Sequence, residues 1–404
     1  MKADLEYDVF VAGGGLAGLT ATLALSNLNQ KVGCCDPYHT YNPSPINPNQ
    51  DRRVTALFLK ATHFLENLGL ASFLSREGIG FSQLEIIDDS PKGIKKIIFD
   101  SDEIGQDRFG TFVLNASLKT ALLQHLADNS LVTCHGETGI TNIRSRSEKL
   151  WLTLSNGTLV STRLLIAADG RHSTVRKILG TKFQSLDIPQ TIASFDVTHP
   201  IPHGNRSIEI HAKGGPLTLI PNPHDKNEAM SSIVWMDDRK EFPSLLNSNL
   251  QKLSEFATAR SLGILGDLTV CSAPKTWCSQ FQMNNSLIGD RIVFIAEAAH
   301  VLPPIGAQGL NLSMGDIDLL VKGIKNQGND PGNPDTLKYY QRQRYPETLT
   351  LMGGVMGLNT LSIAQFDFIA KLRRIGLVNV AKIPLAKKSL IHFGMGNFNP
   401  INVL

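Results

Sequence analysis

Apolar and polar positions near the N-terminus follow the order strand, turn, helix, strand. Residues 8–12 and 31–35 are apolar runs of strand length, and residues 19–28 form an alanine-rich apolar stretch of helix length. A glycine-rich turn over residues 13–18 lies between the first strand and the helix. This β–α–β start is typical of a doubly wound parallel sheet, so we expect a Rossmann-like α/β domain.

A hairpin pattern and a buried strand follow. Residues 149–154 and 158–162 flank an Asn-Gly pair, which favours a tight hairpin turn. Residues 164–168 form a further apolar run that ends before an Asp-Gly pair. We therefore expect three strands in this part of the chain.

The stretch from residue 186 to residue 274 has a different pattern. Short β-type runs alternate with turns rich in proline, glycine and asparagine, and they cover residues 191–198, 207–211, 217–220 and 231–236. This spacing predicts a second domain built on an antiparallel sheet. After it we expect a buried strand at 291–296, a helix from about Leu312, and helical structure beyond Glu347.

Composition and charge exclude several classes of protein. The 404 residues are 42% hydrophobic and 19% charged, which is ordinary for a globular protein of two or three domains. The net charge of +3, without a basic arm, gives no support for nucleic-acid binding. The five cysteines lack metal-ligand spacing, so we expect reduced structural thiols and no metal site.

The N-terminus and the hydropathy pattern predict a cytoplasmic protein. The first residues lack the apolar stretch of a signal peptide. No segment reaches the roughly 18 uninterrupted apolar residues that a membrane span requires. Attachment to the inner face of the membrane remains open.

The glycine-rich turn has the spacing of a dinucleotide-binding motif. Gly13 permits the tight turn, Gly15 lets backbone N–H groups approach a pyrophosphate, and Gly18 lets the helix pack on the strand. Asp36 ends the next strand, where a carboxylate accepts hydrogen bonds from ribose hydroxyls. This motif predicts a nucleotide cofactor but does not separate NAD from FAD.

Two later segments separate these cofactors. Residues 168–176 form an Asp-Gly turn that leads from a buried strand into a helix. Residues 289–311 contain a strand that ends near Glu297, followed by a loop with Pro303 and Gly306 that leads into another helix N-terminus. A helix N-terminus favours the negative charge that develops on a reduced flavin ring, so the segments indicate FAD.

The three segments, in this order and at these separations, resemble those of flavoprotein aromatic hydroxylases of the para-hydroxybenzoate hydroxylase fold. Residues 51–57 are similar to the Asp-x-Arg-x-x-Ala-Leu segment of the ubiquinone-biosynthesis hydroxylase family. Residues 303–312 and the Gly-Pro-Leu sequence at 215–217 with Pro221 are similar to that family too. The resemblance extends over nearly the whole chain.

The resemblance implies a set of residues that bind FAD. The set is Gly13, Gly15, Leu16, Ala17, Gly18, Asp36, Arg53, Asp169, Glu297, Gly306, Gly309, Leu310 and Asn311. The glycine turn would hold the pyrophosphate and Asp36 the adenosine ribose. Arg53 would approach the flavin or its phosphates, and Asp169 would support the cofactor and a transient NAD(P)H.

The resemblance also implies contacts with the ring end of FAD. Glu297 would touch the ribityl chain, and Pro303 with residues 306–311 would border the isoalloxazine. Two positions depart from the family pattern: Glu297 stands where Asp is usual, and Gly315 stands where an Arg is common beside Asp316. These departures put the contact of Glu297 and the end of the following helix in doubt.

The activity that the resemblance implies is that of an FAD-dependent monooxygenase. It would hydroxylate a prenylated phenol, a quinone precursor, with O2 through a flavin hydroperoxide in ubiquinone biosynthesis, with other proteins of that pathway as possible partners. NAD(P)H would be the reductant and would bind transiently, because the chain has no second glycine-rich motif. The alternatives are a monooxygenase of the same fold acting on another apolar metabolite, and a non-catalytic FAD-binding member of a biosynthetic complex.

No catalytic nucleophile is expected, because the cofactor performs the chemistry. Pro303, Gln308 and His300 are expected near the flavin ring, with a structural role in packing the loop as the alternative for His300. The histidines of the second domain are expected to be structural or at the surface: His199, His203 and His211.

The substrate pocket is expected between the second domain and the flavin. Leu217, Leu219 and Ile220 are expected to face the substrate ring. An apolar substrate needs a route from the membrane, and residues 349–404 hold six Lys or Arg against one Asp, a net charge of +5. The interleaved apolar and basic residues at 366–380 predict either an interfacial helix or an ordinary amphipathic helix on the domain.

The patterns together predict a division of the chain into three parts. The parts are an FAD-binding domain of residues 1–75, 100–185 and 275–347, a β-sheet substrate domain of residues 76–99 and 186–274, and a helical C-terminal region of residues 348–404.

Overall fold

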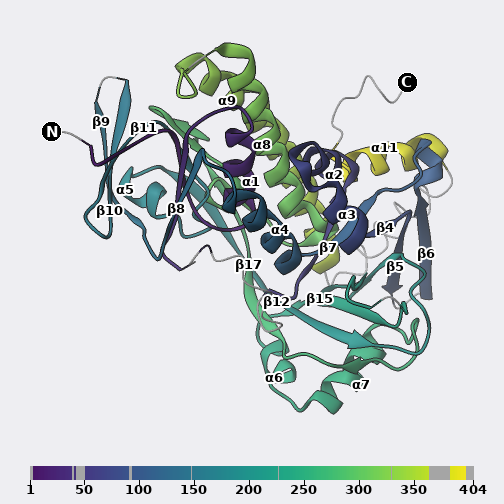
Figure 1. The fold of residues 1–404 in the computed structure, drawn as a ribbon. Helices are drawn as coiled ribbons and strands as arrows, with labels where there is room; N and C mark the ends of the chain where they lie inside the picture. Colours follow the sequence, from purple (N-terminus) through teal and green to yellow (C-terminus); the bar gives the residue numbers. More distant parts are fainter. Residues whose placement is uncertain are drawn as a thin grey trace.

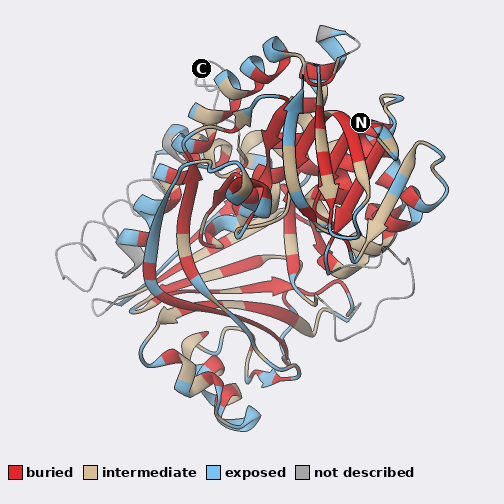
Figure 2. Ribbon diagram, turned by 90° about the vertical axis from the view of Figure 1, so that its left-hand side faces the viewer, coloured by how far each residue is buried: buried red, intermediate tan, exposed pale blue. Residues whose placement is uncertain are grey.

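Two large sheets and one small sheet form the framework of the molecule (Figure 1). The computed structural model describes residues 3–38, 41, 51–90, 93–146, 148–225, 227–328, 330–363 and 383–396. Across these residues the sheets contain eight, nine and three strands. Figure 2 shows long buried runs along the strands, whereas exposed positions lie mainly on the outer helices and loops.

The eight-stranded sheet is the doubly wound sheet that the N-terminal pattern predicts, and it confirms the α/β fold class. Its main strands lie in the order β19-β11-β1-β2-β8, and each neighbouring pair is parallel. The strands of this sheet are β1 (Leu5–Ala12), β2 (Val32–Asp36), β8 (Val132–Gly136), β9 (Ile140–Arg146), β10 (Lys149–Leu154), β11 (Leu159–Ala167), β18 (Ile288–Gly289) and β19 (Ile292–Phe294). The carboxyl ends of the parallel strands share one edge, where ligands bind in such sheets.

Helices pack beside this sheet around one hydrophobic core. The helices of this part are α1 (Leu16–Ser26), α2 (Leu59–Leu65), η1 (Glu66–Leu70), α3 (Ala71–Glu77), α4 (Asn115–Ala127), α5 (Thr174–Ile178), α8 (Gln308–Gln327) and α9 (Pro334–Ile363). α1 contacts both α4 and α8, and α8 contacts the long helix α9 (Figure 1). Fully buried Leu19, Leu118 and Leu320 bring the three shorter helices into the same core as Val9 of β1. Burial of these side chains holds the carboxyl edge of the sheet in place.

The nine-stranded sheet forms the second layer. Its strands are β5 (Gln83–Ser90), β6 (Gly93–Asp100), β12 (Phe183–Thr198), β13 (Ser207–Ala212), β14 (Gly215–Pro221), β15 (Met230–Asp238), β16 (Thr269–Val270), β17 (Lys275–Asn284) and β20 (His300–Val301). The pairing is antiparallel except between β13 and β5. β17 belongs to this sheet by its pairing with β12, although the sequence boundary at 275 places it in the FAD-binding domain.

Alternation along β13 and β14 separates the two faces of this sheet. Ile208, Ile210, Leu217 and Leu219 are buried in a cluster with residues of α6 (Phe242–Leu246) and α7 (Leu250–Arg260), which cover the outer face. The expectation that Leu217 and Leu219 face the substrate ring is therefore wrong. Successive side chains alternate across a strand, so their neighbours on β13 and β14 project from the inner face, toward the FAD-binding part.

A three-stranded sheet, β3 (Val54–Phe58), β7 (Gly110–Leu114) and β4 (Ile79–Phe81), joins the two layers. Phe81 and Phe112 stack in it with ring centroids 4.1 Å apart. The same cluster contains Ile220 of β14 and Ile391 of α11 (Pro384–Gly394). η2 (Ser101–Ile104) contacts α11 from the other side.

Several element boundaries differ from the sequence expectation. Residues 158–162 and 164–168 do not form two strands, because β11 runs without a break from the hairpin into the parallel sheet. α8 begins at Gln308 rather than near Leu312, and α9 begins at Pro334, before Glu347. The segment 366–380, expected to be a helix, lies outside the described residues. Among the residues that are described, no helix has the length and apolar character needed to cross a membrane.

Candidate cofactor site

The glycine turn after β1 is closely packed at two of its three motif positions. Gly13 has φ +121°, and a Cβ placed there would lie 2.2 Å from the carbonyl oxygen of Ala168. A Cβ at Gly18 would lie 2.0 Å from the carbonyl oxygen of Gly13. Neither position accepts a side chain, which explains why the turn requires glycine there.

The middle glycine of the motif, Gly15, is open and lies at the start of α1. A Cβ at Gly15 would meet no atom of the described chain within 4 Å. Gly15 is the N-cap of α1, and no side chain of the described residues caps this helix end. Backbone N–H groups at an uncapped helix N-terminus bind phosphate well, so this turn fits the pyrophosphate of FAD. Leu16 and Ala17 follow it and are half-buried.

Asp36 lies at the carboxyl end of β2, next to the glycine turn. Its Oδ2 accepts a hydrogen bond from the N–H of Gly14 at 2.7 Å, and Oδ1 accepts one from the N–H of Tyr38 at 2.8 Å. An ionised carboxylate has about four acceptor sites. Asp36 therefore keeps capacity for ribose hydroxyls while it fixes the turn.

Asp169 follows β11 at the same edge and has an unsatisfied oxygen. Oδ2 accepts a hydrogen bond from the N–H of Val175 in α5 at 3.0 Å. Oδ1 is buried and has no hydrogen-bond partner within the described part of the chain. A buried oxygen without a partner is costly, and a cofactor hydroxyl or N–H would satisfy it.

Arg53 and Glu297 approach each other from different elements. Arg53 Nε donates to Asp51 Oδ1 at 2.6 Å, and its guanidinium lies 5.8 Å from the ring centroid of Trp277. The hydrogen bond with Asp51 raises the pKa of Arg53, and the charge of Glu297 adds to the effect. Glu297 forms an ion pair with Arg171, Nη2 to Oε1 at 3.1 Å, and its side chain is half-exposed. Both charged groups are held at a surface that a ligand can reach.

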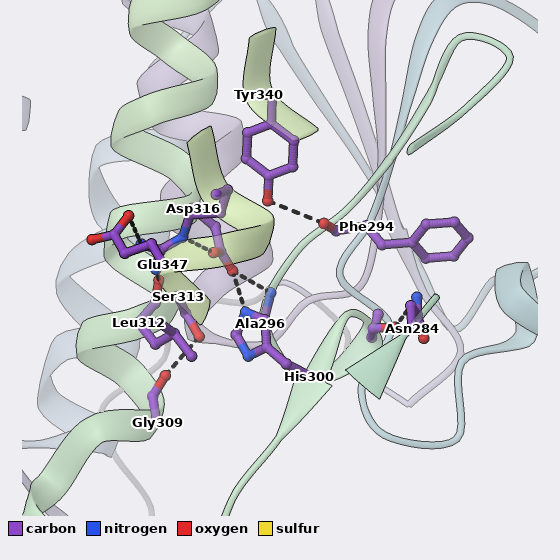
Figure 3. Close-up of polar contacts among 12 residues, drawn as sticks. Asn284, Phe294, Ala296, His300, Gly309, Leu312, Ser313, Asp316, Tyr340 and Glu347 are labelled. Carbon is purple, nitrogen blue, oxygen red and sulfur yellow. Dashed lines mark hydrogen bonds and ion pairs between the residues drawn. The ribbon is translucent and has the colours of Figure 1, made fainter. Parts of the chain in front are cut away.

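A buried polar network fixes the turn that carries Glu297, and Figure 3 labels four of its members: Ala296, His300, Asp316 and Glu347. Asp316 of α8 is fully buried and accepts hydrogen bonds from the N–H of Ala296 and from His300 Nε2, both at 2.8 Å. Arg344 of α9 donates to Asp316 through Nε at 2.6 Å and pairs with Glu347 at 2.7 Å. The network ties the turn η3 (Ala296–Ala298) to α8 and α9.

This network explains two sequence features. His300 is buried and bonded to Asp316, which supports the structural reading of that histidine. Gly315 leaves room for Arg344, since a Cβ at Gly315 would lie 2.8 Å from the guanidinium Nη2. Arg344, which the sequence reading missed, thus pairs with Asp316 beside the position where an arginine is common in the family. Gly315 in place of the usual arginine was the sequence signal that another cationic side chain pairs with Asp316.

The loop before α8 is held from several sides. Gln308 Nε2 donates to the carbonyl oxygens of Gly306 at 3.0 Å and of Gly394 in α11 at 2.7 Å. Asn311 fastens the start of α8 to β3, because its Nδ2 donates to the carbonyl oxygen of Ala56 at 2.7 Å. The N–H of Phe58 donates to Asn311 Oδ1 at 2.8 Å.

The backbone of this loop is strained and partly open. Gly306 in η4 (Ile305–Ala307) has φ +63°, and Ala307 adopts φ +54°, a conformation that non-glycine residues rarely adopt. Ala307 caps α8 without a side-chain hydrogen bond among the described residues, and the adjacent Gly309 has open space around it. Pro303 is buried and Leu310 half-buried. A second uncapped helix N-terminus therefore lies beside this loop.

The loop also touches the nine-stranded sheet. The N–H of Gly306 hydrogen-bonds to the carboxylate of Glu209 on β13. Glu209 was not among the sequence candidates, although polar residues alternate with isoleucines along β13. The contact brings the inner face of the second sheet next to the loop that is expected to border the flavin.

Comparisons with known proteins point to an FAD-binding protein. The model of the family described as "FAD binding domain" matches residues 6–352. Ubiquinone hydroxylase UbiL of Rhodospirillum rubrum is 26% identical over 98% of this chain and 91% of its own length. The 3-demethoxyubiquinol 3-hydroxylase of Escherichia coli is 23% identical over 96% of this chain and 98% of its own length.

A solved structure supports the fold. The p-nitrophenol 4-monooxygenase PnpA of Pseudomonas putida superposes with a TM-score of 0.78 at 16% identity, covering 98% of this chain and 99% of that one. The expected resemblance to the ubiquinone-biosynthesis hydroxylases and the expectation of FAD as cofactor are confirmed. The chain belongs to the FAD binding domain family and is an FAD-dependent monooxygenase.

Proposed function

We propose that this protein hydroxylates a prenylated phenol, a precursor of ubiquinone, with O2 and with NAD(P)H as reductant. The names of the similar proteins support this substrate class. The observation that carries the proposal is the loop from Pro303 to Gln308, which leads from β20 into α8 and hydrogen-bonds through Gly306 to Glu209 on the inner face of the second sheet. FAD held by the residues of this site would supply the oxygen chemistry, with NAD(P)H as the source of electrons.

The protein residues bind and orient the cofactor. The N–H groups after Gly15, at the start of α1, would receive the pyrophosphate, and Asp36 would receive the adenosine ribose. Asp169 would use its Oδ1, which has no partner among the described residues, for the cofactor, and Arg53 would neutralise a phosphate or the reduced ring. The uncapped start of α8 stabilises negative charge near the loop.

The substrate side is apolar. A hydrophobic cluster links Phe99 of β6, Ile220 of β14, Phe58 of β3 and Ala307 of the loop. Ile220, unlike Leu217 and Leu219, is on the face toward this loop. An apolar wall beside the reacting position excludes water. This exclusion protects a reactive oxygen intermediate from side reactions.

The direct test uses purified holoenzyme. We expect consumption of NAD(P)H and O2 to rise when a short-chain prenylated phenol is added, with a product heavier by one oxygen in mass spectrometry. Stimulation without a hydroxylated product would point to another apolar substrate of the same fold. Absence of any NAD(P)H oxidation, with FAD bound, would instead support a non-catalytic role in a biosynthetic complex.

We further propose that α11 contacts a membrane surface. Its inner side places Ile391 and Met395 in the hydrophobic cluster, whereas Leu385 and Leu390 are 55% and 46% exposed beside exposed Lys388. An amphipathic helix with apolar groups and lysine on its outer side suits an anionic lipid surface. A route from the lipid would then end next to Gln308, which bonds to α11.

Flotation with anionic liposomes tests this contact. Leu385→Ser combined with Leu390→Ser is expected to reduce the floated fraction severalfold, while Leu186→Ser, at an exposed position of β12, is the matched control. Point variants are preferable to deletion of the tail, because Ile391 and Met395 are part of the folded core. Equal flotation of the double variant and the wild type would overturn the proposal.

A further inference from the structure

The inner face of β13 carries a polar pair that the cofactor site does not explain. Glu209 and His211 are two residues apart on one strand, so both side chains project from the same face. Glu209 Oε1 lies 2.7 Å from His211 Nε2. The Glu209 side chain is 15% exposed, so part of it remains accessible to a ligand, and His211 is 9% exposed.

The pair lies where the sheet meets the loop. The N–H of Gly306 donates to the Glu209 carboxylate, as described above. Thr218 is opposite Glu209 in the register of β13 and β14, and its Oγ1 lies 3.5 Å from Oε2. The neighbour of Glu209 in the register on the other side is Ile86 of β5, which packs on the same hydrophobic cluster as Ile220. A carboxylate thus stands at the edge of an otherwise apolar wall.

We propose that Glu209 accepts the hydrogen bond of the phenol hydroxyl of the substrate and that His211 is a positioning residue for its carboxylate. The inference rests on the proposed function, since it assumes a phenolic substrate. A phenol O–H that donates to a carboxylate forms a short, charge-assisted hydrogen bond. This bond fixes the orientation of the ring relative to the loop and raises the electron density that oxygen insertion needs.

The carboxylate has the protonation state that this role requires. Burial alone would raise the pKa of Glu209, but hydrogen bonds from His211 and Gly306 outweigh burial, and the pKa lies below its ordinary value of 4.5. A phenol has a pKa of roughly 10. Complete proton transfer to Glu209 would be unfavourable by more than about five pKa units. Glu209 is therefore an acceptor that polarises the O–H bond rather than a base that removes the proton.

Other charged groups near the pair do not replace Glu209. Asp88 of β5 is opposite His211 in the parallel register, and Lys95 of β6 is opposite Asp88 in turn. Ile86 is the residue of β5 opposite Glu209, and Asp88 is two positions farther along that strand, with Lys95 beside it on β6. Glu209 itself has a hydrogen bond to the loop at Gly306.

The test compares binding of a phenol and of its methyl ether to oxidised holoenzyme without NAD(P)H. The probes are 2-prenylphenol and 2-prenylanisole, followed by the change in flavin absorbance, so the readout is affinity rather than activity. A hydrogen bond to a charged group is expected to favour the phenol over the ether by roughly tenfold or more. Glu209→Gln is expected to reduce this preference below about threefold, and His211→Phe to reduce it partly.

The control is Asp237→Asn, which removes a carboxylate from the opposite face of the same sheet. Asp237 of β15 accepts a hydrogen bond from Trp235, a member of the outer cluster, and its pKa is raised by burial. This variant should keep the wild-type preference. The FAD content and thermal midpoint of each variant show whether it is folded, and Glu209→Ala provides a second removal of the charge if Glu209→Gln does not fold.

The outcomes separate this inference from the proposed function. If both probes bind to the wild type and Glu209→Gln keeps the full preference for the phenol, the role of Glu209 is wrong while the substrate class stands. If neither probe perturbs the flavin in the wild type, the proposed substrate class is wrong, and the role of Glu209 is overturned with it. Loss of the preference in Glu209→Gln, but not in Asp237→Asn, supports the assignment.

Discussion

At the scale of single residues, a buried carboxylate on α8 holds together the turn that carries Glu297. This carboxylate, Asp316, is fully buried and accepts hydrogen bonds from His300, Arg344 and the backbone of Ala296. Burial would raise the pKa of Asp316, but the charges of His300 and Arg344 outweigh it, and the pKa lies below its ordinary value of 3.8. The carboxylate therefore stabilises the folded protein while it is ionised.

Asp316→Asn is expected to lower the free energy of unfolding by about 3–5 kcal/mol at neutral pH, because it removes the buried one of the two carboxylates that pair with the guanidinium of Arg344. A folded-state pKa below the unfolded one gives stability above the unfolded value that is lost as pH falls through the folded value. The difference in stability between wild type and variant should thus shrink as the pH falls below 3.8. Urea unfolding at a series of pH values measures it, and a difference independent of pH down to 3 would contradict the assignment.

The motif glycines give a second prediction at this scale. Gly15→Ala is expected to fold normally, because the added methyl group meets no described atom within 4 Å, yet to weaken FAD binding on the order of tenfold by crowding the pyrophosphate. Gly353→Ala is the matched control, since it too has open space and lies inside α9, where alanine favours the helix. Fluorescence titration of apoprotein with FAD measures the affinity. Equal affinities of both variants would place the pyrophosphate elsewhere.

At the scale of elements, α11 packs on the small sheet and contacts the end of the loop before α8. Its Ile391 is buried between the small sheet and β6, Lys387 pairs with Glu103 at 2.7 Å, and the carbonyl oxygen of Gly394 accepts from Gln308. The helix therefore stabilises the loop that is proposed to border the flavin. The sequence pattern alone did not show this, because the contact joins residues about 86 positions apart.

Ile391→Ala is expected to destabilise the protein by about 2 kcal/mol, the low end for a buried isoleucine, because α11 is at the edge of the cluster. Leu385→Ala on the same helix should change the stability by less than about 0.5 kcal/mol, since that side chain is exposed. Limited proteolysis should then cut Ile391→Ala near residues 383–396 faster than the wild type. Similar cleavage of both variants would show that α11 does not depend on this contact.

At the scale of the whole molecule, the sequence predicted secondary-structure elements and short motifs. It did not predict contacts between residues that the fold brings together from distant elements. The parallel sheet and the glycine turn follow from periodicity and from short motifs, so Gly13, Gly18 and Asp36 could be found directly. Arg344 and Glu209 could not, because each meets its partner across separate elements. The faces of β14 were misassigned for the same reason: a run of apolar residues does not reveal which of two layers each one meets.

The proposed FAD site draws residues from β1, β2, β11 and the start of α8, so binding should stabilise the whole FAD-binding part as a unit. With free FAD at 1,000 times its Kd, the folded state gains about 4 kcal/mol over the apoprotein, and the thermal midpoint rises accordingly. FMN, which lacks the adenosine and the pyrophosphate, should give a much smaller shift. Asp36→Ala should reduce the difference between the thermal shifts that FAD and FMN produce, since the carboxylate of Asp36 is proposed to hold the adenosine ribose. An equal shift with FMN in the wild type would mean that the glycine turn and Asp36 do not bind the adenosine half.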